Sequence, residues 1–244
     1  MPARRSHADP VERRGAIVLS CEHAGHAVPK AYRHLFADDP SLLTTHRGYD
    51  IGIAPLAKQL ARLLDVPLIA CHTSRLLIEP NRSLHHRALF SPFSRDLPQA
   101  DKRWLIEHIW QPHRQTVTES IARHIHTGRR VLHLGLHSFT PVLDGCARNT
   151  DIGLLYDPRR RAEKGFALAF QQMLAQTTAR RIRRNYPYRG NADGLTTALR
   201  RNFAARDYLG LEIEVNQALL TAGQSNWRKL APTLAEAVGQ AWRA

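Results

Sequence analysis

The sequence predicts a single α/β domain. Short apolar runs alternate with helical patterns along its 244 residues, and no linker divides them. The run at residues 131–136 is almost wholly apolar, which is typical of a strand buried on both faces in the middle of a sheet. We expect the domain to span residues 15–244. Residues 1–14 are polar and charged without an apolar stretch, which indicates a flexible leader on a cytoplasmic protein.

The composition argues against disulfide-rich and membrane-spanning proteins and bears on nucleic-acid binding. Three cysteines without metal-type spacing argue against a disulfide framework. No apolar segment approaches the roughly 20 residues that a membrane-spanning helix needs. The net charge of +14 could attract nucleic acid or any anionic substrate. Its arginine clusters are scattered and no nucleic-acid-binding motif accompanies them, so solvated surface arginines are the preferred interpretation.

Residues 16–20 form the first predicted core strand, and a loop with chemically active side chains follows it directly. Glu22 and His23 are neighbours there, so an extended backbone would point them to opposite sides. Only one of them could easily reach a given metal, and we favour His23. An ordinary surface-loop histidine is the alternative.

A helical pattern covers residues 51–64, with its apolar positions on one stripe. Asp50 stands where the N-cap of this helix belongs, and capping would explain a carboxylate at that position. A carboxylate that points from a helix start into a cleft could equally ligate a metal. Pro55 is tolerated only in the first turn, so the helix begins no earlier than Asp50.

Two further strands are predicted, at residues 66–70 and 74–82. Polar groups crowd the end of the second, where the planar fork of Arg82 suits a carboxylate or an oxyanion. Residues 101–126 are helical in pattern, and Pro112 is expected to break or kink them into two helices.

His137 follows the central apolar run, at the carboxyl end of the predicted strand. Open α/β sheets bind ligands at that edge, so a neutral imidazole there indicates a metal ligand or a proton carrier. A buried structural histidine is the alternative.

The C-terminal half continues the alternation of strands and helices. A strand is expected at 152–156, a helix at 162–174, a polar loop at 184–191, a helix ending near residue 205 and a closing helix at 226–243. Residues 208–217 alternate as a strand does, so Glu212, Glu214 and Asn216 share one face. If this face looks into solvent, the strand is an ordinary edge strand. If it lines the cleft, one of the glutamates is a natural general base.

His23, Asp50 and His137 together supply two nitrogens and one carboxylate from three separate elements. Two histidines and one acid with an open fourth position are the usual ligands of a hydrolytic zinc centre. Such a metal generates hydroxide near neutral pH and polarises a carbonyl, while a nearby glutamate moves the proton. Neither a phosphate-binding glycine loop nor a G-x-S-x-G elbow is present, which argues against kinase-like and serine hydrolase chemistry.

The chain resembles the N-formylglutamate amidohydrolase family from residue 17 to about residue 220. The segments that carry the resemblance, in order, are LSCEHAGHAVP, HRGYDIG, SRLLIEPNR, LHSFTPVLDG, DIGLLYDP, RNYPYRG and LEIEVNQ. The family is related to zinc carboxypeptidases and aspartoacylases, which implies one three-layer α/β/α domain around a mixed, mostly parallel sheet. The resemblance also implies one Zn²⁺ per chain, held by His23, Asp50 and His137, with Asn81 and Arg82 on the substrate and Glu214 as the base.

Two positions depart from the family's pattern. Glu79 stands where relatives tend to carry Asp, and Glu22 stands where the better-known members carry another residue, so Glu22 could compete with Asp50 as a metal ligand. The chain also looks like a shorter branch of the family, whose members need not share one substrate.

The resemblance implies a zinc-dependent hydrolase for the amide bond of an N-acylated acidic amino acid, with N-formyl-L-glutamate as the named substrate. Arg82 would polarise the carbonyl oxygen or hold a carboxylate, and the further substrate-binding candidates are Arg75, Arg148, Arg189 and Glu212. The alternatives are a metallo-deacylase, amidase or peptidase for another small substrate, and a basic nucleic-acid-binding protein without catalytic activity.

Overall fold

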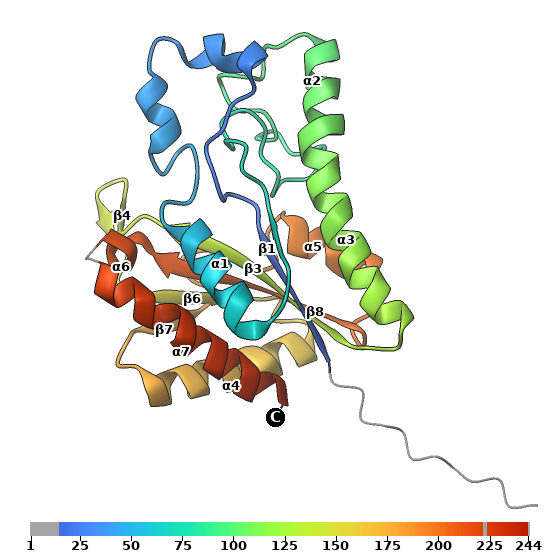
Figure 1. Ribbon diagram of the computed structural model, residues 1–244, viewed down its shortest axis with the longest axis vertical. Helices are drawn as coiled ribbons and strands as arrows, with labels where there is room; N and C mark the ends of the chain where they lie inside the picture. Colours follow the sequence, from blue (N-terminus) through green and yellow to red (C-terminus); the bar gives the residue numbers. More distant parts are fainter. Residues whose placement is uncertain (1–14, 222–223, 244) are drawn as a thin grey trace, which may run out of the picture.

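A mixed, mostly parallel sheet lies at the centre of the computed structural model, which describes residues 15–221 and 224–243 (Figure 1). Its strands in spatial order are β2 (Leu68–Ala70), β1 (Ala16–Cys21), β3 (Val131–Phe139), β8 (Tyr208–Asn216), β6 (Ile152–Leu155) and β7 (Ile182–Arg184). Only the pairing of β6 with β8 is antiparallel among them. The predicted α/β class and mixed sheet are therefore confirmed.

Helices cover both faces of this sheet and make the three layers. One apolar cluster joins the sheet to α1 (Ile53–Leu64), α4 (Arg161–Thr177) and α7 (Gln224–Arg243). A smaller cluster on the other face joins it to α3 (Gln111–His126) and α5 (Leu195–Asn202). Strand β3 is buried along its whole length, as the apolar run at 131–136 predicts.

A third apolar cluster forms a cap beside the sheet, in the upper part of Figure 1. It contains the 3₁₀ helices η1 (Lys30–Phe36) and η2 (Pro40–Thr44), helix α2 (Gln99–Leu105) and parts of the loop between residues 76 and 97. The remaining elements are a hairpin of β4 (Val142–Leu143) and β5 (Cys146–Ala147), and the short helix α6 (Gln217–Thr221).

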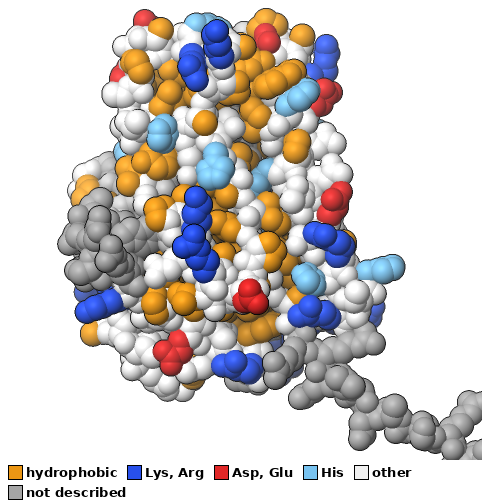
Figure 2. Space-filling view, viewed as in Figure 1, with side chains coloured by type: hydrophobic (Ala, Val, Ile, Leu, Met, Phe, Trp, Pro, Cys, Tyr) orange, Lys and Arg blue, Asp and Glu red, His pale blue; other side chains and the backbone are white. Residues whose placement is uncertain are grey.

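Lys and Arg side chains lie singly or in small groups on the face drawn in Figure 2, without a continuous basic surface on that face. On this face (Figure 2), the basic side chains are arranged as separate solvated groups. In the described ranges, no helix combines the length and the apolar character that crossing a membrane requires.

The predicted strand at 74–82 is wrong. This segment is a series of turns whose backbone hydrogen bonds are local, such as those from Leu77 to Ser74 (2.9 Å) and from Arg82 to Glu79 (3.2 Å). Pro80 has no amide hydrogen to give to a sheet, and the apolar residues of the segment pack into the cap instead. Strand β7, by contrast, falls in a stretch without a clear strand pattern and is not predicted.

Two helix starts also differ from expectation. Helix α1 begins at Ile53 with Gly52 (φ 78°) as its N-cap, so Asp50 is not the cap and its side chain is free for another role. Pro112 does not separate two helices, because it lies in the first turn of α3 and the π-helical turn η3 (Ile106–Trp110) connects α2 directly to α3. The segment therefore runs as one helical rod from residue 99 to residue 126.

Candidate metal centre

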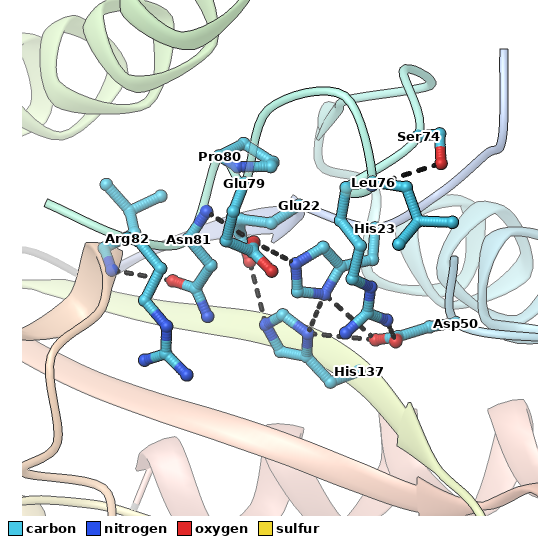
Figure 3. Close-up of polar contacts among 12 residues, drawn as sticks. Glu22, His23, Asp50, Ser74, Leu76, Glu79, Pro80, Asn81, Arg82 and His137 are labelled. Carbon is cyan, nitrogen blue, oxygen red and sulfur yellow. Dashed lines mark hydrogen bonds and ion pairs between the residues drawn. The ribbon is translucent and has the colours of Figure 1, made fainter. Parts of the chain in front are cut away.

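Three side-chain atoms from separate elements converge at one edge of the sheet (Figure 3). His23 follows β1, Asp50 precedes α1 and His137 lies near the carboxyl end of β3. The Nδ1 atoms of the two histidines are 3.2 Å apart, and Asp50 Oδ2 lies 3.4 Å from Nδ1 of His23 and 3.0 Å from Nδ1 of His137. All three residues are buried. The parallel order of β1 and β3 brings the two histidines to the same edge.

His23 Nδ1, Asp50 Oδ2 and His137 Nδ1 form a triangle whose size suits a zinc ion. Tetrahedral ligands at about 2.0–2.1 Å from zinc lie roughly 3.3 Å from one another. The three observed separations, 3.0 to 3.4 Å, agree with that value. The donor set of two imidazoles and one carboxylate is that of hydrolytic zinc sites, and it leaves the fourth position to water or substrate. These residues could therefore hold one zinc ion.

Each histidine of the triangle has a carboxylate on its other nitrogen. Glu79 Oε1 lies 2.5 Å from Nε2 of His23, and Glu22 Oε2 lies 2.9 Å from Nε2 of His137 (Figure 3). A carboxylate at Nε2 favours a proton on that nitrogen, so Nδ1 is the nitrogen that would bind a metal. Glu22 thus lies behind His137, on the side of the ring away from the triangle, and not in the position of a competing ligand.

Asp50 is fixed by groups on both of its oxygens. Ser138 donates its backbone N–H to Oδ2 at 3.1 Å, and Arg75 donates to Oδ1. Arg75 is therefore engaged with the carboxylate of the triangle, which leaves less of its guanidinium for a substrate.

Burial and neighbouring charges shift the pKa values of these groups. Burial, followed by the charge of Arg75, lowers the pKa of His23 to about 4. Burial would also lower the pKa of His137, but hydrogen bonding to Glu22 and its charge outweigh this and raise it to about 9. Burial alone would raise the pKa of Glu79, yet the charge and the hydrogen bond of His23 lower it to about 2.

Strand β8 brings Glu214 next to the triangle, because its backbone pairs with that of His137. The Glu214 side chain is buried, its Oε2 has no hydrogen-bond partner in the described part of the chain, and burial raises the pKa of the carboxyl. Glu212 lies on the same face and accepts a hydrogen bond from Thr196 Oγ1. The solvent-facing edge strand is thus ruled out, because both glutamates line a cavity.

This cavity has a volume of about 230 Å³, below the range of about 300–1,000 Å³ typical of drug-sized ligands. It suits a small molecule. Its polar lining comprises His23, Asp50, Arg75, Glu79, Asn81, Arg82, His137, Ser138, Tyr188, Arg189, Asp193, Glu212 and Glu214.

The substrate-binding candidates take different positions. Asn81 accepts a hydrogen bond from the backbone of Leu195 at 2.7 Å, Arg82 donates to the carbonyl of Asp193, and both line the cavity. Arg189 lines it from an exposed position at the mouth. Arg148 is not among the lining residues. Its guanidinium lies over the ring of Tyr188 and donates to the Tyr188 hydroxyl at 3.0 Å, so it supports the rim.

The sequence singles out segments of this site without assigning every role in it. Glu22 and Glu79 stand out as positions that depart from the family's pattern, but nothing in their spacing indicates which histidine ring each one meets. Tyr188 and Asp193 reach the cavity through the loop before α5, whose course depends on tertiary packing.

Comparison with known proteins gives a consistent picture. A sequence model described as N-formylglutamate amidohydrolase matches residues 15–221. Among curated proteins none matches the chain. The structure of gene product Atu2144 from Agrobacterium tumefaciens is similar with a TM-score of 0.81 and 29% identity, covering 94% of this chain and 91% of that one. An N-formylglutamate amidohydrolase from Ralstonia eutropha JMP134 shares the fold, with a TM-score of 0.67, 18% identity and 96% of both chains covered.

Proposed function

The chain belongs to the N-formylglutamate amidohydrolase family, and from this premise we propose that it is a zinc-dependent hydrolase of N-acylated acidic amino acids, with N-formyl-L-glutamate as substrate. Water would cleave the amide bond and release formate and glutamate. The observation that carries the proposal is the triangle of His23, Asp50 and His137 at the base of a small cavity with Glu214 beside it.

His23 Nδ1, Asp50 Oδ2 and His137 Nδ1 would hold the zinc ion. When bound, zinc supplies a Lewis acid that polarises a carbonyl and makes water nucleophilic near neutral pH. The protein's own contribution begins with Glu79 and Glu22, which keep the Nε2 proton on each histidine and fix both rings. Arg75 and the Ser138 amide hold the Asp50 carboxylate in place.

Glu214 would be the general base. It takes a proton from the attacking water as the new C–O bond forms at the formyl carbon. It then returns the proton to the amide nitrogen as the C–N bond breaks, so that the leaving group departs as a neutral amine. Burial raises the pKa of its carboxyl, which brings it closer to the neutral range where a group can both accept and donate a proton.

Arg82 and Asn81 would bind the substrate. Both come from the turn segment that follows Glu79, and Arg82 lines the cavity with its guanidinium fork. The fork suits the carbonyl oxygen or a carboxylate of the substrate, and Arg189 at the mouth offers a second cationic group. The small cavity volume favours a single acylated amino acid over a longer peptide.

The decisive experiment combines metal analysis with a substrate panel. Purified wild-type protein is expected to contain about one zinc per chain, and His137→Ala is expected to lose it. His126→Ala is the matched control, because His126 is an exposed histidine at the end of α3. The panel compares N-formyl-L-glutamate with N-formyl-L-glutamine and N-acetyl-L-glutamate.

Hydrolysis that is fastest with N-formyl-L-glutamate and lost in His137→Ala would support the full proposal. Zinc-dependent hydrolysis of another panel member would keep the reaction class and replace the substrate. A folded wild type that binds no zinc and hydrolyses none of the compounds would overturn the proposal.

A further inference from the structure

The carboxylate behind His137 has a second partner outside the triangle. Glu22 Oε2 faces His137, and Glu22 Oε1 lies 3.3 Å from Nε2 of His113 on α3. Glu22 is 1% exposed and His113 is 8% exposed, so both groups make this contact away from bulk water. A series of polar contacts therefore links His113 on helix α3 to Glu22 and Glu22 to His137.

A glycine in the central sheet leaves space for these polar contacts. Gly135 lies on the same face of β3 as His137, two residues earlier. A Cβ atom there would lie 3.7 Å from both Glu22 Oε2 and His137 Nε2, and 3.3 Å from Glu212 Cγ. Any larger side chain would occupy the space of the Glu22 carboxylate, so the glycine keeps the path between the helix and the ring open.

The two histidines of the triangle differ in how their carboxylates are held. Glu79, behind His23, accepts a hydrogen bond at 3.0 Å from the backbone amide of Asn81 in its own turn. Glu22 has no such backbone donor among its described contacts, and its second oxygen relies on the imidazole of His113. The orientation of His137 thus depends on a helix about 90 residues away from Glu22 in the sequence.

The same helical turn supports the substrate side of the site by separate contacts. Arg114, the next residue after His113, donates to the carbonyl of Pro80 at 3.0 Å and lies over the ring of Trp110. Trp110, the last residue of the π-helical turn, donates to the carbonyl of Arg82 at 2.8 Å. Adjacent residues of one helix therefore contact two different parts of the site.

We propose that His113 is a positioning residue of the metal centre, which holds Glu22 so that Glu22 fixes the His137 ring with Nδ1 toward the metal. This inference rests on the proposed function, because it takes the triangle as a zinc site. Partners of metal-binding histidines typically contribute 10- to 100-fold to metal affinity. His113 acts one step further out. Arg114 beside it donates to the segment that carries Arg82, and its positive charge also acts on Glu22.

The test measures zinc affinity by competition with a chromogenic chelator, and kcat and KM separately. His113→Leu is expected to weaken zinc binding by up to about 10-fold, the lower end of the range for direct partners of the ligands, because it acts through Glu22. His113→Gln can still donate to Glu22 and is expected to recover most of that loss. Arg114→Lys, at an equally buried position (8% exposed), keeps the positive charge near Glu22 and loses the guanidinium contact, so it is expected to keep the zinc affinity and raise KM. His126→Gln, on an exposed part of α3, should leave both unchanged.

Glu22→Gln provides a second route if His113→Leu does not fold, because the amide has nearly the shape of the carboxylate. It is expected to weaken zinc binding. Adding His113→Asn, which removes Nε2 and with it the contact to Glu22, should cause little further loss, since both residues act through one contact. The inference would be overturned if His113→Leu left the zinc affinity unchanged, or if Arg114→Lys weakened it equally. A wild type that binds no zinc would overturn the proposed function as well, so the two failures are distinguishable.

Discussion

His23 and His137 face each other through their Nδ1 atoms at 3.2 Å, while the Nε2 atom of each lies near a carboxylate oxygen, at 2.5 Å for His23 and 2.9 Å for His137. Two unprotonated imidazole nitrogens would aim lone pairs at one another, and such a contact is favourable only with a cation or a shared proton between them. On each ring, the carboxylate near Nε2 favours a proton on that nitrogen. The fold therefore builds a pair of nitrogens that requires a positive charge, and Asp50 adds the negative charge that completes the set.

Zinc is expected to stabilise the folded protein because the site is assembled only on folding. At a free zinc concentration of 1,000 times the Kd, mass action adds about 4 kcal/mol to the free energy of unfolding. Asp50→Asn should abolish most of this gain, whereas magnesium should have little effect on the wild type because it prefers oxygen ligands. Thermal unfolding with and without each ion checks the prediction. An equal zinc-induced shift in Asp50→Asn would contradict it.

Glu214→Gln is expected to lower kcat by about 10²- to 10⁴-fold while zinc content stays at one per chain, because general acid–base catalysis contributes that much. Glu212→Gln is the matched comparison, since Glu212 lies on the same face of β8 but already accepts a hydrogen bond from Thr196. It should affect kcat much less. Steady-state kinetics on zinc-loaded protein decide between them, and retained turnover in Glu214→Gln would remove that residue from the role of base.

Much of the fold and the triangle is predictable from the sequence, because both depend on local patterns. The apolar runs at 16–20 and 131–136 predict two buried strands, and the structure shows that these strands are parallel neighbours. Since the carboxyl ends of parallel strands share one edge, that pairing brings His23 and His137 together. The alternation in 208–217 similarly predicts that Glu212 and Glu214 share a face, and the structure shows that this face lines the cavity.

The rest of the site depends on contacts that no local pattern encodes. His113 meets Glu22 from a helix that continues through the π-helical turn η3 into α3, whereas the sequence suggests a break or kink at Pro112. The turns at 74–82 look like a strand because their apolar residues are needed for the cap. Both cases are decided by tertiary packing, which overrides the local preference.

Arg82→Gln is expected to lower kcat/KM by about 10- to 150-fold, because hydrogen bonds to charged groups contribute roughly 1.5–3 kcal/mol. Kinetic constants distinguish the two possible roles of Arg82, which are binding a substrate carboxylate and stabilising the carbonyl oxygen. A rise in KM alone would assign Arg82 to a substrate carboxylate, and a fall in kcat would assign it to the carbonyl oxygen in the transition state. Arg95→Gln is the control, since that exposed arginine of the cap contacts Asp96. Unchanged kcat/KM in Arg82→Gln would exclude both roles.

Arg200→Met is expected to destabilise the protein by about 3 kcal/mol, because it leaves a buried carboxylate without its main cation. Arg200 Nε lies 3.0 Å from Glu163, which is 1% exposed, and Arg200 also donates to the carbonyl of Gly190 at 2.5 Å. Arg159→Met is the surface counterpart, because the Arg159 side chain is 78% exposed beside Asp157. Its loss should destabilise the protein far less, because ion pairs exposed to solvent contribute little to stability. Urea unfolding measures both, and equal costs would contradict the prediction.

His133 is expected to make stability depend on pH. It lies fully buried in β3 between Ser20 Oγ (2.8 Å) and Tyr208 Oη (2.9 Å), and burial lowers its pKa from 6.5 to about 4. Between these values the unfolded chain binds a proton that the folded protein does not, so stability falls as pH drops from 6.5 toward 4. One pKa unit corresponds to about 1.4 kcal/mol, and the full loss is therefore about 3 kcal/mol.

His133→Gln lacks this titration, so the stability difference between wild type and variant should shrink by about 3 kcal/mol across the same pH range. Urea unfolding at pH 7.5, 6.5, 5.5 and 4.5, with a chelator in every sample, measures the difference without a metal contribution. Other acidic groups titrate in both proteins and cancel in the comparison. A difference that stays constant with pH would show that His133 binds its proton equally well in the folded and the unfolded chain.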